Sequence, residues 1–120
     1  MKPSSAFPKI YLCSHSVDFR MGLYSLLAFA QGYLLVNMTD AGNLTVFFNK
    51  RRNAVKCIYW DHTGYAMWHK ALEKNLFPKV NIEPGALVLE LESIQLDLFL
   101  SGIDFIAHKT HKKKLFSALY

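Results

Sequence analysis

The chain has 120 residues, of which 52% are hydrophobic and 19% charged. This composition can bury one core, so we expect one folded domain and exclude a disordered chain, a complete Rossmann dehydrogenase, a TIM barrel and a full-size transposase catalytic core. The formal net charge of +5 favours a polyanionic partner such as nucleic acid.

The first half of the chain predicts a strand followed by a helix. Residues 9–13 (KIYLC) are rich in β-branched and aromatic side chains, which is typical of a strand. Asp18 is a suitable N-cap for a following helix, in which the apolar side chains of residues 23–30 recur with the spacing of one buried stripe. Gly32 would end this helix. Residues 33–38 fit either a strand or a packed loop.

The second half predicts a run of strands and a closing helix. Residues 44–49 and 54–61 read as two paired strands joined by a short turn, and residues 65–70 as a third strand antiparallel to the second. Residues 86–91 predict a short strand, and residues 96–103 a helix that Gly102 terminates. We therefore expect an α+β fold, with a small antiparallel sheet of three to five strands, an N-terminal helix and a C-terminal helix. The folded domain should span residues 1–104, followed by a basic tail at 105–120.

The stretch from residue 21 to residue 36 is apolar, but polar residues interrupt it and it is shorter than the roughly 20 residues that span a bilayer. The first residues lack the apolar core of a secretory signal. We expect a cytoplasmic protein without a membrane partner. Cys13 and Cys57 lie among apolar residues and should be reduced, buried thiols rather than a disulfide.

Charge is distributed unevenly along the chain. Residues 41–82 hold seven bases against two acids, residues 83–104 hold five acids and no base, and residues 105–120 hold four lysines and no acid. The basic middle could bind a polyanion, or the acidic segment could neutralise it within the fold.

The turn formed by Lys50, Arg51 and Arg52 is the strongest candidate for binding DNA. Such a turn can present three cations to consecutive phosphates, and arginine can bind a phosphate through two hydrogen bonds. In the strand that follows, Lys56 shares a face with Ile58 and Trp60, and it would add a fourth charge if that face were the outer one. The aromatic side chains near the turn could stack on unpaired bases, although large aromatics more often belong to the core. In the tail, Lys112, Lys113 and Lys114 could bind phosphate without sequence specificity, unless the tail is only a solvated terminus.

Catalytic and metal-binding motifs are absent from the sequence. It has no CxxC, HxH or HExxH spacing, no G-x-S-x-G and no Walker loop. A small Mg²⁺-dependent nuclease would need a carboxylate cluster such as Asp18, Asp61, Glu73 and Asp104, but helix capping, turn formation and ion pairing are commoner roles for these residues. We expect no enzymatic activity, no metal and no cofactor.

Five motifs occur in order along the chain. They are residues 17–22 (VDFRMG), 44–53 (LTVFFNKRRN), 55–64 (VKCIYWDHTG), 68–73 (WHKALE) with Phe77 following, and 100–104 (LSGID). Together they resemble TnpB, the Orf2-like accessory protein of bacterial transposable elements of the insertion sequence 66 family. Ala71 departs from the arginine usual in that family, and Asn75 and Leu76 replace a common glycine-arginine pair. These departures weaken the case for nucleic-acid contacts by the segment from residue 70 to residue 77.

The resemblance implies a role in transposition beside a separate, larger transposase, with DNA and other proteins of the element as partners. The family offers no catalytic residues to carry over. The motif positions singled out are Asp18, Arg20, Gly22, Trp60, Asp61, Gly64, Lys70, Glu73, Gly102 and Asp104. Several of them could be purely structural, with Asp61 accepting hydrogen bonds in a turn and Arg20 pairing with Asp18 or with a carbonyl at the end of the sheet.

Two functional hypotheses follow. The first is a non-enzymatic accessory protein that contacts DNA through the basic turn, assisted by the tail lysines. The second is a protein–protein adaptor, in which the acidic segment or an exposed aromatic face docks the transposase without contacting DNA.

Overall fold

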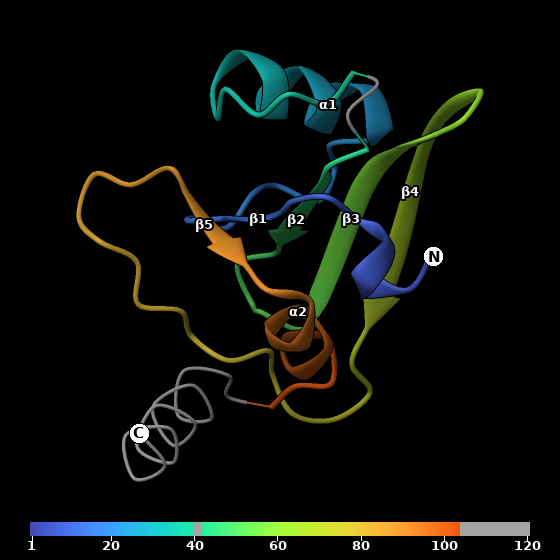
Figure 1. The fold of residues 1–120 in the computed structure, drawn as a ribbon. Coiled ribbons are helices and arrows are strands. Elements are labelled where there is room, and N and C mark those ends of the chain that lie inside the picture. Colours follow the sequence, from blue (N-terminus) through green and yellow to red (C-terminus); the bar gives the residue numbers. More distant parts are fainter. Residues whose placement is uncertain (40–41, 104–120) are drawn as a thin grey trace, which may run out of the picture.

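Five strands form one mixed sheet in the computed structural model, which describes residues 1–39 and 42–103 (Figure 1). The strands are β1 (Ile10–Cys13), β2 (Leu44–Phe48), β3 (Ala54–Asp61), β4 (Gly64–Ala71) and β5 (Val88–Leu91). Their order across the sheet is β4-β3-β2-β1-β5. Strands β1 and β2 are parallel, and the other neighbouring pairs are antiparallel. The predicted α+β class is confirmed, with one parallel pair in the sheet.

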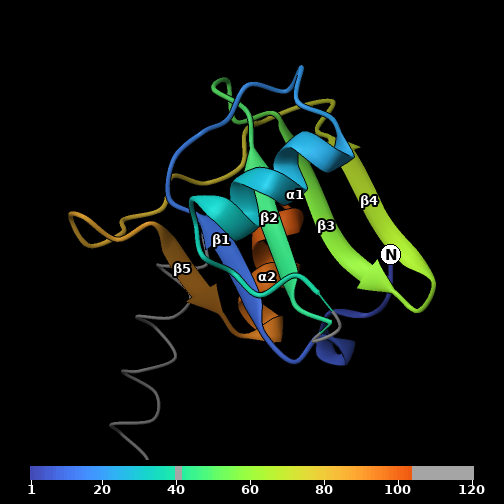
Figure 2. The ribbon, with the colours of Figure 1, turned by 90° about the horizontal axis from the view of Figure 1, so that it is seen from above.

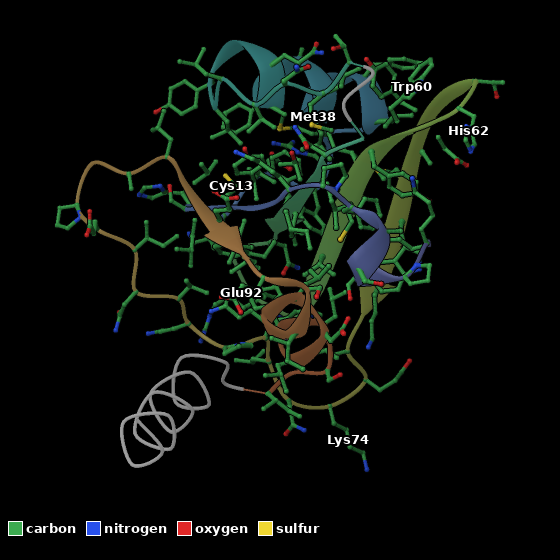
Figure 3. The ribbon with its side chains drawn as sticks, in the orientation of Figure 1. Cys13, Met38, Trp60, His62, Lys74 and Glu92 are labelled. Atoms are coloured by element: carbon green, nitrogen blue, oxygen red, sulfur yellow. The ribbon has the colours of Figure 1, made fainter. Side chains whose placement is uncertain are left out.

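One helix covers each face of the sheet (Figures 1 and 2). Helix α1 (Leu23–Gly32) packs on one face and helix α2 (Ser93–Leu100) on the other, while a short 3₁₀ helix, η1 (Ser4–Ala6), precedes β1. Strand β3 divides its side chains between the two cores: Cys57 belongs to the cluster beneath α2, whereas Ile58 belongs to the cluster beneath α1 (Figure 3 draws the side chains between the layers). The period-two pattern of this strand therefore has two buried faces, and the layers are helix, sheet and helix.

The prediction that Asp18 caps α1 is wrong. The N-cap residue is Gly22, and no side chain caps this end of the helix. The Asp18 carboxylate instead accepts hydrogen bonds from the main-chain N–H and the guanidinium of Arg20. An aspartate can satisfy N–H groups of a local turn as readily as those of a helix start, and here the turn precedes the helix.

Residues 33–38, for which the sequence fits either a strand or a loop, form a packed loop. Leu34, Val36 and Met38 are buried against the α1 side of the core. Leu35 has a φ of 59° and a side chain that is 77% exposed. The apolar side chains therefore alternate between core and solvent without any strand pairing.

The end of α2 follows the prediction for Gly102. This glycine has a φ of 78°, its N–H donates to the Phe99 carbonyl, and the N–H of Ile103 donates to the Leu98 carbonyl. This is the Schellman arrangement, which satisfies the last carbonyls of a helix and favours glycine at the left-handed position. At the other end, Glu92 and Gln95 form a capping box.

No helix within the described parts of the chain is long and apolar enough to cross a membrane. Cys13 and Cys57 are free and buried, as predicted. The basic tail at 105–120 lies outside the described residues, so the predicted boundary after residue 104 stays a prediction.

Candidate nucleic-acid interface

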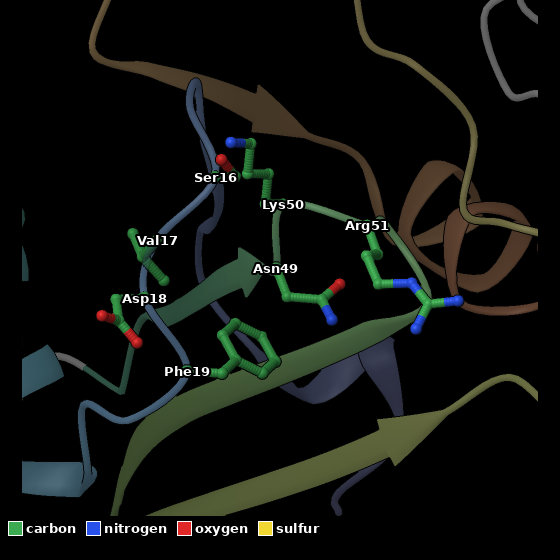
Figure 4. Close-up of a pocket in the computed structure, with 7 residues that line it drawn as sticks. All are labelled: Ser16, Val17, Asp18, Phe19, Asn49, Lys50 and Arg51. Carbon is green, nitrogen blue, oxygen red and sulfur yellow. The ribbon is translucent and has the colours of Figure 1, made fainter.

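The basic turn lies at the carboxyl end of β2, beside the loop that leads into α1 (Figure 4). Together they border an open hollow of about 410 Å³. It is lined by Ser16, Val17, Asp18, Phe19, Asn49, Lys50 and Arg51. Lys50 and Arg51 are both exposed. In Figure 4 the Lys50 side chain extends on the side of Ser16, whereas the Arg51 guanidinium points away from it, so the two cations present charge over a broad arc.

Asn49 fixes the shape of this turn. Its side-chain oxygen accepts hydrogen bonds from the main-chain N–H groups of Asn53 (3.0 Å) and Ala54 (3.1 Å), and its Nδ2 donates to Oδ1 of Asn53 at 2.6 Å. Its carbonyl accepts the N–H of Arg52. These bonds satisfy the turn's polar groups internally, so the turn is held at a fixed angle at the end of the sheet.

Arg52 is less accessible than the other two cations of the turn. It is partly buried and has a φ of 59°, a backbone conformation uncommon for a side chain of this size. Its carbonyl accepts the N–H of Phe77 at 2.7 Å, and its Nη1 donates to the Phe77 carbonyl at 3.3 Å. Arg52 thus ties the turn to the buried Phe77 and keeps its charge, while Lys50 and Arg51 are the two exposed cations of the predicted three.

Lys56 is not on an outer face, and this corrects its predicted place in the interface. The residue is 7% exposed. Its Nζ donates to the carbonyls of Phe19 and Met21, each at 2.9 Å, and lies 4.9 Å from the centre of the Phe19 ring. The loop before α1 folds over the strand and covers this position. Lys56 therefore holds the wall of the hollow in place and has no side available to DNA.

Arg20 and Asp18 form an exposed pair on the same loop. The Arg20 Nη2 lies 2.6 Å from Oδ2 of Asp18, and Nε donates to the same oxygen at 2.9 Å. The hydrogen bonds from Arg20 lower the pKa of Asp18 to about 2, and those same bonds raise the pKa of Arg20. The expected alternative, in which Arg20 pairs with Asp18, is the arrangement observed.

Among the residues singled out on β3 and β4, Lys70, Trp60 and Trp68 contact other parts of the fold. The Lys70 Nζ donates to the Leu100 carbonyl at 2.8 Å, which places a positive charge at the C-terminus of α2. The ring of Trp60 packs edge-on against Tyr65 at 4.9 Å, and Trp68 packs on the core beneath α2. Trp68 and Tyr65 therefore pack on the core, as favoured from the sequence, whereas Trp60 belongs to neither core cluster and packs on Tyr65.

Three other motif residues lie at a turn or are exposed to solvent. Asp61 and Gly64 are opposite each other at the ends of the β3–β4 hairpin. The Asp61 main-chain carbonyl accepts the N–H of Thr63, so the turn contact that the structure records for this residue runs through its backbone. Glu73 is exposed.

The remaining predicted positions, Asp104, Lys112, Lys113 and Lys114, lie outside the described residues. In the described ranges, no group of three or more His, Cys, Asp or Glu side chains could hold a metal ion. Within residues 1–39 and 42–103, Arg20 and Asp18 form the only ion pair, so neither Lys50 nor Arg51 is neutralised by a described carboxylate.

Sequence reasoning missed the wall opposite the basic turn. Ser16, Val17 and Phe19 precede the first helix by several residues, and only the folding of their loop brings them beside Lys50. The role of Asn49 could have been predicted from the sequence, since asparagine is a common turn-forming residue and this one directly precedes the basic turn.

Residues 8–110 match the family model described as "IS66 Orf2 like protein". The chain belongs to this family. It is similar to two uncharacterized proteins of Sinorhizobium fredii: 33% identical to y4jC over 97 residues, covering 81% of this chain and 80% of the relative, and 32% identical to y4hO over 105 residues, covering 88% and 89%. No solved structure matches the chain. The IS66 Orf2-like protein is thus an accessory protein of an insertion-sequence element.

Proposed function

We propose that this IS66 Orf2-like protein binds the DNA backbone through Lys50 and Arg51, as a non-catalytic component of transposition that works beside the transposase. One observation carries the proposal: two exposed cations project from a turn fixed at the end of the sheet, and no described carboxylate pairs with them. Because the backbone of the turn is already fixed, only the two side chains lose conformational freedom when they meet phosphates, so more of the electrostatic gain is kept as affinity.

The hollow beside the turn supports the same placement. It gives a phosphate chain room to approach Lys50 from the side of Ser16, whose hydroxyl can donate a further hydrogen bond to phosphate. The wall of the hollow is held by Lys56, so the approach has a defined shape. Contacts of this type give affinity and orientation, without base-specific readout.

The test is the salt dependence of DNA binding. Removing one cation that binds a phosphate makes the slope of log affinity against log salt shallower by about 0.9, so the double variant Lys50→Gln/Arg51→Gln should reduce it by about 2 and Lys50→Gln alone by about 1. Lys9→Gln is the matched control, because Lys9 is exposed but precedes the start of β1, at the opposite end of the sheet. An unchanged affinity and slope in the double variant would refute the proposal. Replacing Lys112, Lys113 and Lys114 by glutamine measures the share of the tail separately.

The adaptor hypothesis keeps one specific observation in its favour. Glu83, Glu90, Glu92 and Asp97 are all exposed, and no base lies among them in the sequence. Glu90 and Glu92 lie at the end of β5, which is beside the start of β1 and so away from the basic turn, whereas Glu83 lies beside Ser14 and His15. The adaptor hypothesis predicts that the protein does not bind DNA at low salt but binds the transposase, and that Glu90→Lys and Glu92→Lys abolish this binding. That result would make docking through these acidic residues the function in place of DNA binding.

A further inference from the structure

Strand β4 is an open edge of the sheet. It pairs with β3 along its whole length, from Gly64 opposite Asp61 to Ala71 opposite Ala54, and no described strand lies on its other side. The opposite edge, β5, has four residues, whereas β4 has eight. In Figure 2, β4 forms one margin of the sheet, and α1 crosses above the other strands toward it.

The outward backbone groups of β4 can be identified from the ladder. The N–H of Leu72 donates to the Asn53 carbonyl, so these two residues form a hydrogen-bonded pair. Hydrogen-bonded and non-hydrogen-bonded pairs alternate in an antiparallel ladder, and the register with β3 is continuous. Every second residue of β4 therefore directs its N–H and C=O away from β3. These residues are Tyr65, Met67, His69 and Ala71.

This edge lacks the features that usually prevent strands from pairing. It contains no proline, and its register with β3 runs without a bulge. Its one lysine, Lys70, is turned toward α2, where its Nζ bonds the Leu100 carbonyl. Met67, at the middle of the strand, is 38% exposed. A long edge whose one lysine is turned away, with an exposed apolar side chain at its middle, is a template for another strand.

We propose that β4 pairs with β4 of a second copy of this chain, antiparallel and about a two-fold axis at Met67, so that the two sheets become continuous. In this register the outward residues pair with each other: Met67 of the two copies meet, and Tyr65 lies opposite His69 of the second copy. Lys70 lies opposite Gly64 of the second copy, so the edge meets itself without opposing like charges. A two-fold interface requires this kind of self-complementarity, which a partner strand of unrelated sequence need not match.

Strand pairing needs apolar burial as well as hydrogen bonds. A stable interface buries roughly 800 Å² on each partner, which is more than the edge of one strand supplies. Met67 and Tyr65 share the α1 face of β4, and Trp60 of β3 lies directly opposite Tyr65 in the ladder. These three side chains extend the contact from the strand edge onto the neighbouring sheet surface.

Sedimentation equilibrium of the full chain tests the proposal. We expect the parent to have twice the mass of one chain at micromolar concentration and Met67→Lys to have the mass of one chain, because the two new lysines would face each other across the axis. Leu35→Lys is the matched control and should remain a dimer, since Leu35 is 77% exposed and follows α1, away from β4. A parent that stays monomeric up to about 100 μM overturns the proposal.

A second measurement keeps the result independent of folding defects. Met67→Cys introduces a partly exposed thiol into a chain whose own two cysteines are buried. A short bis-maleimide reagent should link two copies of this variant, whereas Leu35→Cys should stay unlinked under the same conditions. Equal linking of both variants, or a Met67→Lys protein that is folded by circular dichroism and still dimeric, overturns the β4 assignment.

Discussion

Replacing Lys56 by methionine tests the structural role that the fold gives to this residue. Methionine keeps most of the aliphatic stem and removes the ammonium, so the carbonyls of Phe19 and Met21 lose their 2.9 Å donors. Two hydrogen bonds to a charged group stabilise by roughly 3 kcal/mol together, and removing the nearly buried ammonium restores part of its desolvation cost. We therefore expect a loss of about 2 kcal/mol in the free energy of unfolding.

Urea unfolding followed by circular dichroism measures this loss. Lys50→Met is the matched control: it makes the same change at an exposed position and should alter the free energy of unfolding by less than about 0.5 kcal/mol. Amide exchange should also quicken in residues 17–22, because Lys56 holds that loop to the sheet. If Lys56→Met is as stable as the parent and the loop exchanges no faster, the buried ammonium does not hold the loop.

Three further predictions concern single groups. In an NMR titration the Asp18 carboxyl should have a pKa of about 2, and Arg20→Gln should return this pKa toward 3.8. Because the pKa is lower in the folded state, the stabilisation from this pair is complete above a pH of about 4 and is lost as the pH falls through about 2. An unchanged Asp18 titration in the variant would contradict that cause. Burial raises the pKa of Cys57, so a thiol reagent should label neither cysteine at pH 8 until denaturant is added; rapid labelling of the folded protein would exclude the buried state. Gly102→Ala should lower the free energy of unfolding by about 1 kcal/mol, because alanine is strained at the left-handed end of α2, whereas Gly32→Ala, inside α1 with open space around it, should not lower it; equal losses would exclude the strain argument.

Local patterns in the chain were sufficient for most of the elements. The hairpin of β3 and β4 and the division of Cys57 and Ile58 between two faces follow from alternation, which is a property of the strand itself. The end of α2 at Gly102 follows from the freedom of glycine at positive φ. The start of α1 was misplaced because Asp18 can satisfy a turn before the helix as well as a helix start.

The candidate site was less predictable than the fold. The sequence placed Lys50 and Arg51 on an exposed turn, and they lie there. It also grouped Arg52 and Lys56 with them, because bases close together in a sequence give no sign of which are exposed and which are covered by another segment. The hydrogen-bond partners of Arg52 and Lys56, the carbonyls of Phe77 and Met21, are 25 and 35 residues away in the chain.

Periodicity and turn chemistry act within a few residues, so local patterns were enough to predict most strands and helices and to place a cluster of bases in a turn. The parallel pairing of β1 with β2, the position of β4 at the margin and the inward direction of Lys56 became known only from the folded chain. Strand order and the covering of a strand face depend on contacts between distant segments. Side-chain alternation predicts which residues share a face of a strand, but it does not predict which distant segment covers that face.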